Sequence, residues 1–322
     1  MKKMISLGIV LPCFNEAAQI EKTIIELDKQ IEVLINKKKI NKTVICIIDD
    51  GSIDNTWSII SNLKKNFDQF TNKKIIGLKF SKNFGHQYAL LAGINRINDK
   101  VDCILTVDSD LEQDISILPN FIEEFEKGNE IVLGIRKNTQ LVTGFKSLTS
   151  KMFYKIANLL KLNLESDHAD YRLISSRVAK EVSMHNEYYI FLRGLITNIG
   201  FKTSKIYYDE NLKTNRKSRY TKIKMLELAI DGITSYSIVP LRILSALGFL
   251  TVIFSLIMIF YVFYVKLFLN TKAPGWASTV LPIYFIGGIN LFFLGIVGEY
   301  VGKIYIETKK RPRFIIEKIL ED

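Results

Sequence analysis

The stretch Cys103-Ile-Leu-Thr-Val-Asp108-Ser-Asp110 joins a short apolar run to two acidic residues that follow it directly. Ile104–Val107 is typical of a short buried strand, and the two aspartates come where such a strand opens into a loop. Both carboxylates can then reach one point, and paired oxygen ligands of this kind suit Mg²⁺ or Mn²⁺, which in turn bind diphosphates. Taken alone, Asp-Ser-Asp is also ordinary turn chemistry. The surrounding sequence has to decide between these interpretations.

Strand-like and helix-like patterns alternate on both sides of this stretch. Short apolar runs predict five strands: Ser6–Cys13, Val44–Ile48, Ile75–Phe80, Ile104–Val107 and Ile131–Ile135. Apolar residues at helical spacing lie between them, as in Ile117–Phe125. This alternation predicts an α/β fold with a mainly parallel sheet and helices on both faces. In such sheets, ligands bind beyond the carboxyl ends of the strands.

Polar clusters follow four of the predicted strands. The clusters are Pro12–Glu16, Asp49–Asp54, Ser81–His86 and the Asp108/Asp110 pair. Each is an ordinary turn in isolation, and Asp50-Gly51-Ser52 can also cap the next helix. Together they would lie on one edge of one sheet, where Asp49 or Asp50 can accept from a base and Glu16 can bind a ribose. The four clusters therefore predict a nucleotide site.

Two long apolar stretches near the C-terminus predict transmembrane helices. Ile243–Val265 and Trp276–Gly298 each contain 23 residues without a charge, enough to span roughly 35 Å as a helix. Lysines and arginines are concentrated before the first stretch and after the second, whereas Lys266–Gly275 holds only two lysines. The positive-inside rule therefore predicts cytoplasmic ends and an external loop. Lys222–Pro240 has the pattern of an amphipathic interfacial helix.

The net charge of +11 does not indicate a nucleic-acid partner, because the basic residues are concentrated beside the predicted spans. Anionic lipid headgroups account for that distribution more simply. The three cysteines, Cys13, Cys46 and Cys103, are far apart and set in apolar runs. Their spacing indicates reduced, buried thiols in a cytoplasmic domain and neither a disulfide framework nor a metal site.

Motifs along nearly the whole chain resemble those of a known protein family. They are Pro12–Glu16, Asp49–Asp54, Asn83–Gln87, Asp108–Gln113, Gly134–Arg136, Asp170–Leu173, Phe191–Gly194, Asp231–Ser235, Gly298–Tyr305 and Arg311-Pro312. With these the chain resembles the family 2 glycosyltransferases of GT-A fold, most closely polyprenyl-phosphate glycosyltransferases such as bactoprenol glucosyltransferases and dolichyl-phosphate mannose synthases. It departs from their pattern in Ser109, where alanine is commoner, and in lacking a glycine before Ser218.

The resemblance implies a role for each group of site residues. The donor nucleotide would be bound by Pro12, Glu16, Asp49, Asp50 and Asn83. The catalytic residues would be Asp108, Asp110, Asp170 and Arg172, of which Asp108 and Asp110 would also hold Mg²⁺ or Mn²⁺. The phosphate groups of donor and acceptor would face Arg136, Arg216, Lys217 and Arg219. Because a phosphate acceptor is largely ionised near neutral pH, Asp170 can either remove a proton or position a substrate.

The chain is thus expected to be an inverting, metal-dependent enzyme of the bacterial inner membrane. It would transfer a sugar, first of all glucose from a UDP-sugar, to undecaprenyl phosphate for glycosylation of the cell envelope. N-acetylglucosamine, galactose, mannose and a modified pentose remain alternatives. So does an inactive scaffold or flippase-partner subunit, whereas a processive synthase is disfavoured because neither tryptophan follows an arginine. Self-association through the spans is plausible.

This interpretation predicts four consecutive parts of the chain. Residues 1–215 would form the cytoplasmic GT-A domain and 216–240 a juxtamembrane amphipathic segment. Residues 241–300 would form two transmembrane helices with a short external loop, and 301–322 a cytoplasmic tail. The predicted fold class is therefore a Rossmann-like α/β domain followed by interfacial helices and two membrane spans.

Overall fold

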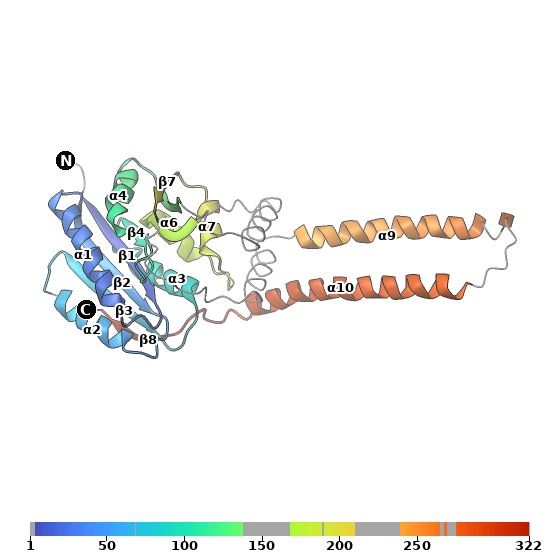
Figure 1. Cartoon of the computed structure of the whole chain (residues 1–322), viewed down its shortest axis with the longest axis horizontal. Coiled ribbons are helices and arrows are strands. Elements are labelled where there is room, and N and C mark those ends of the chain that lie inside the picture. Colours follow the sequence, from blue (N-terminus) through green and yellow to red (C-terminus); the bar gives the residue numbers. More distant parts are fainter. Residues whose placement is uncertain are drawn as a thin grey trace. The chain divides into compact units, whose positions relative to one another are not determined.

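The apolar runs of the N-terminal half form the centre of an eight-stranded sheet in the computed structural model (Figure 1). The structure describes residues 4–67, 69–137, 168–188, 190–209, 239–264, 267–268 and 275–321. The strands are β1 (Ile5–Cys13), β2 (Ile40–Asp49), β3 (Lys73–Phe80), β4 (Cys103–Thr106), β5 (Ile131–Arg136), β6 (His168–Ser175), β7 (Thr203–Tyr208) and β8 (Ile316–Leu320). Their order across the sheet is β7-β5-β6-β4-β1-β2-β3-β8.

Helices cover both faces of this sheet. One face carries α1 (Ile20–Asn36), α2 (Thr56–Phe67) and α4 (Leu118–Glu126), and the other carries α3 (His86–Ile97), α6 (Ser176–Met184) and α7 (Leu192–Asn198). Side chains alternate between the two cores along each strand: Ile9 and Leu11 of β1 belong to the first core and Val10 to the second. In α1 the buried residues recur every three or four positions, which is why one stripe of that helix faces the sheet.

The prediction of a mostly parallel α/β sheet is confirmed. β1 pairs in parallel with β2 and β4, β2 with β3, and β5 with β7. The antiparallel pairs are those of β6 with β4 and β5, and of β8 with β3. The sequence analysis did not identify β6, β7 or β8, and β8 lies in the part that it expected to be a tail.

The two predicted spans are helical. They belong to α9 (Val239–Tyr264) and α10 (Trp276–Thr308), which contact each other. Val239–Met258 and Phe285–Thr308 are long and apolar enough to cross a membrane, and neither is buried inside the protein. Exposed apolar side chains such as Phe249 and Leu250 distinguish α9 from the core helix of a soluble domain. The length, composition and exposed apolar side chains of these two helices fit association with a membrane.

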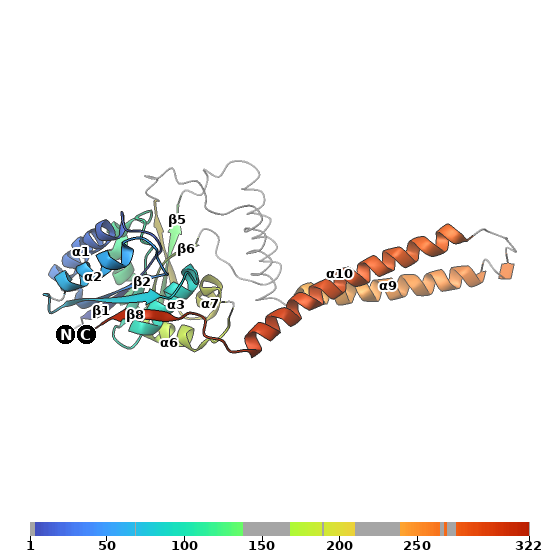
Figure 2. The same ribbon diagram turned by 90° about the horizontal axis from the view of Figure 1, so that it is seen from below.

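The chain leaves its sheet domain and later returns to it. The two units are residues Met1–Tyr220 with Pro312–Asp322, and Thr221–Arg311. The second unit contains α9 and α10, and β8 follows it as the edge strand of the first (Figure 2). Before Val239, the predicted interfacial helix lies outside the described residues.

Candidate active site

The predicted site residues gather along one edge of the sheet because of how its strands run. β1 to β5 point their carboxyl ends to the same edge, whereas β6 runs the opposite way and begins there. Asp49 ends β2, Asp108 follows β4, Arg136 ends β5, and Asp170 lies near the start of β6. This is the edge at which α/β sheets bind their ligands.

The loops after β1 and β2 are joined by hydrogen bonds. Asn15, which has a positive φ of 55°, donates its backbone N–H to Ser52 Oγ over 2.9 Å and accepts from the N–H of Ile53 through Oδ1 over 3.0 Å. The backbone N–H of Glu16 donates to Thr56 Oγ1 over 3.0 Å, and the Glu16 residue is buried. Sequence reasoning missed Asn15, although its place between the quoted Pro12 and Glu16 marked it as polar.

The paired acids after β2 have different partners. Asp49 is fully buried, and its Oδ1 accepts from the N–H of Ser52 over 2.8 Å. Its Oδ2 is buried and has no hydrogen-bond partner among the described residues. Asp50 accepts from the N–H groups of Phe84 at 2.7 Å and Gly85 at 3.0 Å. Burial raises the pKa of Asp50, although these two hydrogen bonds oppose the rise. Asp50 thus orients the loop after β3.

Gly51 explains how close the loops after β2 and β3 lie. Its φ is +72°, and a Cβ placed on it would be 2.3 Å from the carbonyl carbon of Lys82 and 2.7 Å from the backbone nitrogen of Asn83. Only glycine accommodates both the left-handed conformation and this approach. Asn83 itself is exposed beside that contact, and Pro12 lies at the end of β1 opposite Ile48 of β2.

The Asp108–Asp110 loop is held from both sides. The backbone N–H of Asp108 donates to Gln113 Oε1 over 3.1 Å, and Gln113 Nε2 donates to Asp108 Oδ2 over 2.6 Å. On α1, Thr23 Oγ1 donates to the carbonyl of Ser109 over 2.7 Å. Oδ1 of Asp110 accepts from the N–H of Glu112 over 3.1 Å. Both aspartates are only partly buried, so each can still present an oxygen to a ligand.

The electrostatics of this loop fit a divalent cation. Burial raises the pKa of Asp108 to about 6, and the like charges of Asp170 and Asp110 add to the rise, while His86 opposes it. A bound cation would remove this repulsion between carboxylates. The part of the chain that the structure describes contains no group of three or more potential metal ligands. Two carboxylates with substrate phosphates and water complete an ordinary Mg²⁺ site, so Asp108 and Asp110 fit that role.

Asp170 has a different environment, because two arginines neutralise it. Arg193 donates from Nε to Oδ1 over 3.1 Å and from Nη2 to Oδ2 over 2.7 Å. Arg172 Nη2 donates to Oδ1 over 3.0 Å. Asp170 is buried, which disfavours its charge, yet His86 and the two arginines hold the pKa of its carboxyl well below the ordinary value. A carboxylate with so low a pKa is a poor proton acceptor.

Arg172 lies behind Asp170 and is inaccessible to solvent. Its side chain is 0% exposed, and within the described residues Nε and Nη1 have no hydrogen-bond partner. Arg172 was predicted to lie near the reacting centre, and that role stays a prediction. Its guanidinium donates to the Asp170 carboxylate, which it orients.

Two further residues complete the cluster. His86 Nε2 lies 3.5 Å from Asp108 Oδ1 and 3.4 Å from Asp170 Oδ2, so it connects the two acidic groups. Arg193, on α7, is more than a third exposed while it holds Asp170. Neither was among the predicted site residues. The signal for Arg193 was its position in the motif Phe191–Gly194, a cation inside an apolar run.

The predicted phosphate-binding residues are only partly described. Arg136 ends β5, is partly exposed, and lies with Nε 3.4 Å from the hydroxyl oxygen of Tyr208. Arg216, Lys217 and Arg219 lie outside the described residues. Their assignment to the acceptor stays a prediction.

Comparisons with known proteins show the family of the chain. The sequence model of the family described as "Glycosyl transferase family 2" matches residues 8–183. An uncharacterized glycosyltransferase of Bacillus subtilis, YkoT, is 39% identical over 97% of this chain and 91% of its own length. The Escherichia coli protein named "prophage bactoprenol glucosyl transferase homolog" is 31% identical over 97% of this chain and 99% of its own length.

A solved structure also matches part of the chain. Residues 1–349 of Staphylococcus aureus TarS, crystallised in complex with UDP, share 17% identity with it. That match covers 63% of this chain and 60% of the other, with a TM-score of 0.41.

Proposed function

Because the chain belongs to glycosyl transferase family 2, we propose that it transfers glucose from UDP-glucose to a polyprenyl phosphate, undecaprenyl phosphate in bacteria. The observation that carries the proposal is the length of the similarity. Proteins named for bactoprenol glucosyl transfer match 97% of this chain, α9 and α10 included, rather than the sheet domain alone. An acceptor with a polar head and an insoluble tail requires both the sheet domain and the apolar helices.

The loops at the edge of the sheet support the donor part of the proposal. The joined loops after β1 and β2 would bind the nucleotide, with Glu16 accepting from the ribose and the buried Asp49 and Asp50 ordering the loops around the base. Asp108 and Asp110 would hold Mg²⁺ or Mn²⁺. When bound, such an ion stabilises the negative charge that builds on the leaving nucleoside diphosphate. Arg136 and Arg193 supply fixed positive charge near the phosphates.

The proposed reaction is a single in-line displacement with inversion. A phosphate oxygen of the lipid forms a bond to the anomeric carbon, and the bond from that carbon to the diphosphate oxygen breaks, releasing UDP with the electron pair. The lipid phosphate is already largely ionised near neutral pH, so no strong general base is needed. This agrees with an Asp170 whose pKa is held low by His86, Arg172 and Arg193. We assign Asp170 to positioning.

The return of the chain to its sheet supports a cytoplasmic site. β8 pairs with β3, so the segments before α9 and after α10 are on one side of any membrane that the two helices cross. A chain that crosses the membrane twice returns to the side on which it started, whereas a chain that crosses once does not. Nucleotide-sugars are made in the cytosol, and the positively charged flanks indicate that side for both segments.

Transfer of label to lipid tests the proposal. Purified protein would be incubated with undecaprenyl phosphate, Mg²⁺ and a panel of radiolabelled nucleotide-sugars, and label entering the organic phase would be counted. UDP-glucose is expected to give the largest transfer, and the Asp108→Ala protein almost none. Larger transfer from another nucleotide-sugar would show that the assignment of glucose is wrong and would identify the sugar. Neither transfer nor donor hydrolysis with any donor would favour the inactive scaffold instead.

Labelling of single cysteines tests the orientation. Cys13, Cys46 and Cys103 are buried, so they give a low background with an impermeant thiol reagent. In intact cells Thr271→Cys is expected to react and Lys309→Cys to react only after the cells are opened. The opposite pattern would place the site outside and contradict the use of cytosolic nucleotide-sugars.

A further inference from the structure

The segment that follows α10, residues Arg313–Glu321 (here the C-terminal segment), lies against the loop after β3. β8 pairs antiparallel with β3, from Gly77 opposite Leu320 to Phe80 opposite Ile316. One residue beyond this pairing, the N–H of Ser81 donates to the carbonyl of Ile315 over 3.0 Å. The C-terminal segment therefore meets β3 where β3 opens into the loop Ser81–His86.

Aromatic contacts continue from the C-terminal segment into that loop. The ring of Phe314 stacks on Phe80 with a centroid distance of 5.0 Å and an interplanar angle of 15°. Phe80 in turn meets Phe84 edge to face at 5.7 Å and 89°. Phe84 is the residue whose N–H donates to Asp50, and His86, two residues on, lies beside Asp108. Three rings thus connect the C-terminal segment to the loop that borders the catalytic carboxylates.

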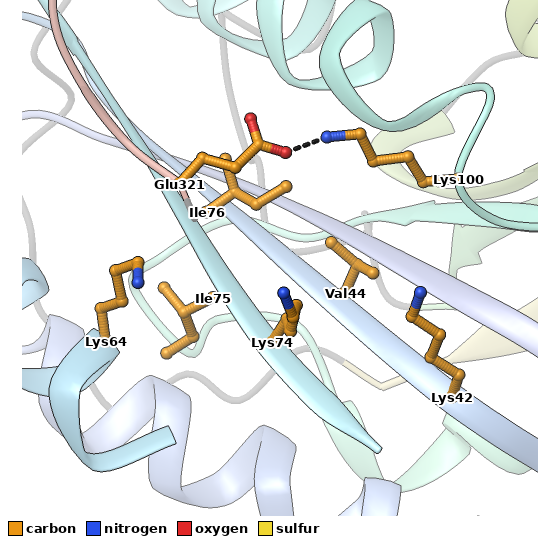
Figure 3. A pocket seen from close by; sticks show the side chains of 8 residues that line it. All are labelled: Lys42, Val44, Lys64, Lys74, Ile75, Ile76, Lys100 and Glu321. Carbon is orange, nitrogen blue, oxygen red and sulfur yellow. Dashed lines mark hydrogen bonds and ion pairs between the residues drawn. The ribbon is translucent and has the colours of Figure 1, made fainter. Parts of the chain in front are cut away.

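The C-terminal segment is fixed at both of its ends. At the end near the site, Arg313 Nη2 donates to the carbonyl of His185 over 2.5 Å. At the other end Glu321 forms ion pairs with Arg96 and Lys100. This second anchor borders a cavity of about 270 Å³ at the amino ends of β2 and β3, whose other charged lining residues are Lys42, Lys64 and Lys74 (Figure 3). A segment held at both ends can restrict the loop that it contacts between them.

We propose that Phe314 is a positioning residue for donor binding, acting through Phe80 and Phe84 on the loop Ser81–His86. The proposal rests on the proposed function, since it takes that loop as part of the donor site. The loop is tied to Asp50 by the N–H groups of Phe84 and Gly85, which donate to its carboxylate. Removing the Phe314 ring removes the ring stacked on Phe80, loosens the Phe80–Phe84 contact and lets those amides leave Asp50 more often.

The alternative is that the C-terminal segment only covers the edge of β3. Edge strands are commonly protected in this way, and every disruptive change in the segment would then lower stability without a specific effect on the loop. Phe314 and its neighbour Ile315 distinguish the two possibilities. Phe314 packs against the core, whereas the Ile315 side chain is 56% exposed. Ile315 contacts the loop only through its backbone carbonyl, which accepts from Ser81 and is retained when the side chain is substituted.

The experiment compares full-length Phe314→Ala, Phe314→Tyr and Ile315→Ala with the wild type in lipid nanodiscs. Amide hydrogen exchange over Ser81–His86, measured without nucleotide, reports the loop independently of any donor. The affinity for UDP and the kinetic constants for UDP-glucose report how a change in this loop affects donor binding. An aromatic pair of this kind corresponds to about a twofold to tenfold change in an equilibrium.

Phe314→Ala is expected to speed exchange in Ser81–His86 and to raise both the Kd for UDP and the KM for UDP-glucose about twofold to tenfold, with little change in kcat. Phe314→Tyr should restore wild-type values, and Ile315→Ala should match the wild type.

Unchanged exchange or unchanged UDP affinity in folded Phe314→Ala would overturn the proposal. Equal effects of Ile315→Ala would overturn it as well. A wild type that binds no UDP would instead overturn the UDP-sugar assignment, and the exchange comparison would still decide whether Phe314 orders the loop.

Discussion

The Asp108–Asp110 loop and Asp170 present the same functional group at the same edge of the sheet, in opposite electrostatic surroundings. Asp108 and Asp110 face like charge, and the pKa of Asp108 is raised to about 6. Asp170 is held by Arg172, Arg193 and His86, and its pKa is held low. Beside the first region lies His86, which it shares with Asp170, so a ligand can add positive charge there, whereas the second region already has Arg172 and Arg193. The difference assigns a cation to one region and a positioning role to the other.

The largest effect is expected from removing a carboxylate of the first region. Asp108→Ala and Asp110→Ala should each lower kcat/KM at least about a thousandfold, since charge stabilisation by a metal is worth several kcal/mol. Excess chelator should have the same effect on the wild type, reversed by Mg²⁺ or Mn²⁺. The measurement is transfer of label from UDP-glucose to undecaprenyl phosphate. Asp99→Ala, a change at an exposed carboxylate that pairs with Lys180 after α3, provides the control. Full activity in chelator would contradict the metal assignment.

The second prediction concerns stability and separates the two regions directly. Asp170→Asn should lower the free energy of unfolding by about 3–5 kcal/mol, because it leaves Arg172 and Arg193 without their counter-charge and Arg172 is fully buried. Asp108→Asn should leave stability equal or higher in the absence of divalent ions, because it removes a charge that burial and the like charges of Asp170 and Asp110 disfavour. Thermal unfolding of both proteins measures the contrast. Equal destabilisation would mean that the two carboxylates have similar surroundings.

The general arrangement of this site was predictable from sequence, because the strands that carry it are apolar runs ended by polar clusters. Ile104–Val107 and the aspartates after it are the clearest example, and the observed β4 ends at Thr106. The partners of Asp170 were not predictable in the same way. Arg172 and Asp170 interrupt their own strand with charge, so β6 has no apolar run, although both side chains are buried.

The C-terminal strand illustrates a second limit of sequence reasoning. Ile316-Glu-Lys-Ile-Leu320 alternates weakly and carries two charges, as an edge strand with an exposed face does. Its partner β3 lies more than 230 residues earlier in the chain. No local pattern reports such a distant pairing, so the segment was expected to be a tail. Arg193 was missed for a related reason, since its partner Asp170 is distant in sequence.

The third prediction is a pH dependence that only the first region should show. The folded-state pKa of Asp108, about 6, is above the ordinary value of 3.8. Ionising Asp108 therefore disfavours the folded state, so its contribution to stability is fully present below about pH 4 and is lost as pH rises through about 6. Without divalent ions, the Tm of Asp108→Asn minus that of the wild type should increase over this interval. Saturating Mg²⁺ should remove the trend. A difference that stays constant with pH would contradict the raised pKa.

The smallest effect is expected at His86, which contacts both regions. Its Nε2 lies at 3.4–3.5 Å from Asp108 and Asp170, and the side chain is 41% exposed. Solvent-exposed ion pairs are typically worth 0.2–1 kcal/mol, so His86→Gln should lower kcat/KM at most about fivefold. The same kinetic assay measures it, with His185→Gln as a control, because His185 is remote in sequence and its ring bonds only a backbone carbonyl within the described residues. Because Arg172 and Arg193 would still hold Asp170, the free energy of unfolding should fall less than in Asp170→Asn. A loss of a hundredfold or more would mean that His86 contacts the reacting atoms, and the two acidic regions would then work through a shared group rather than separately.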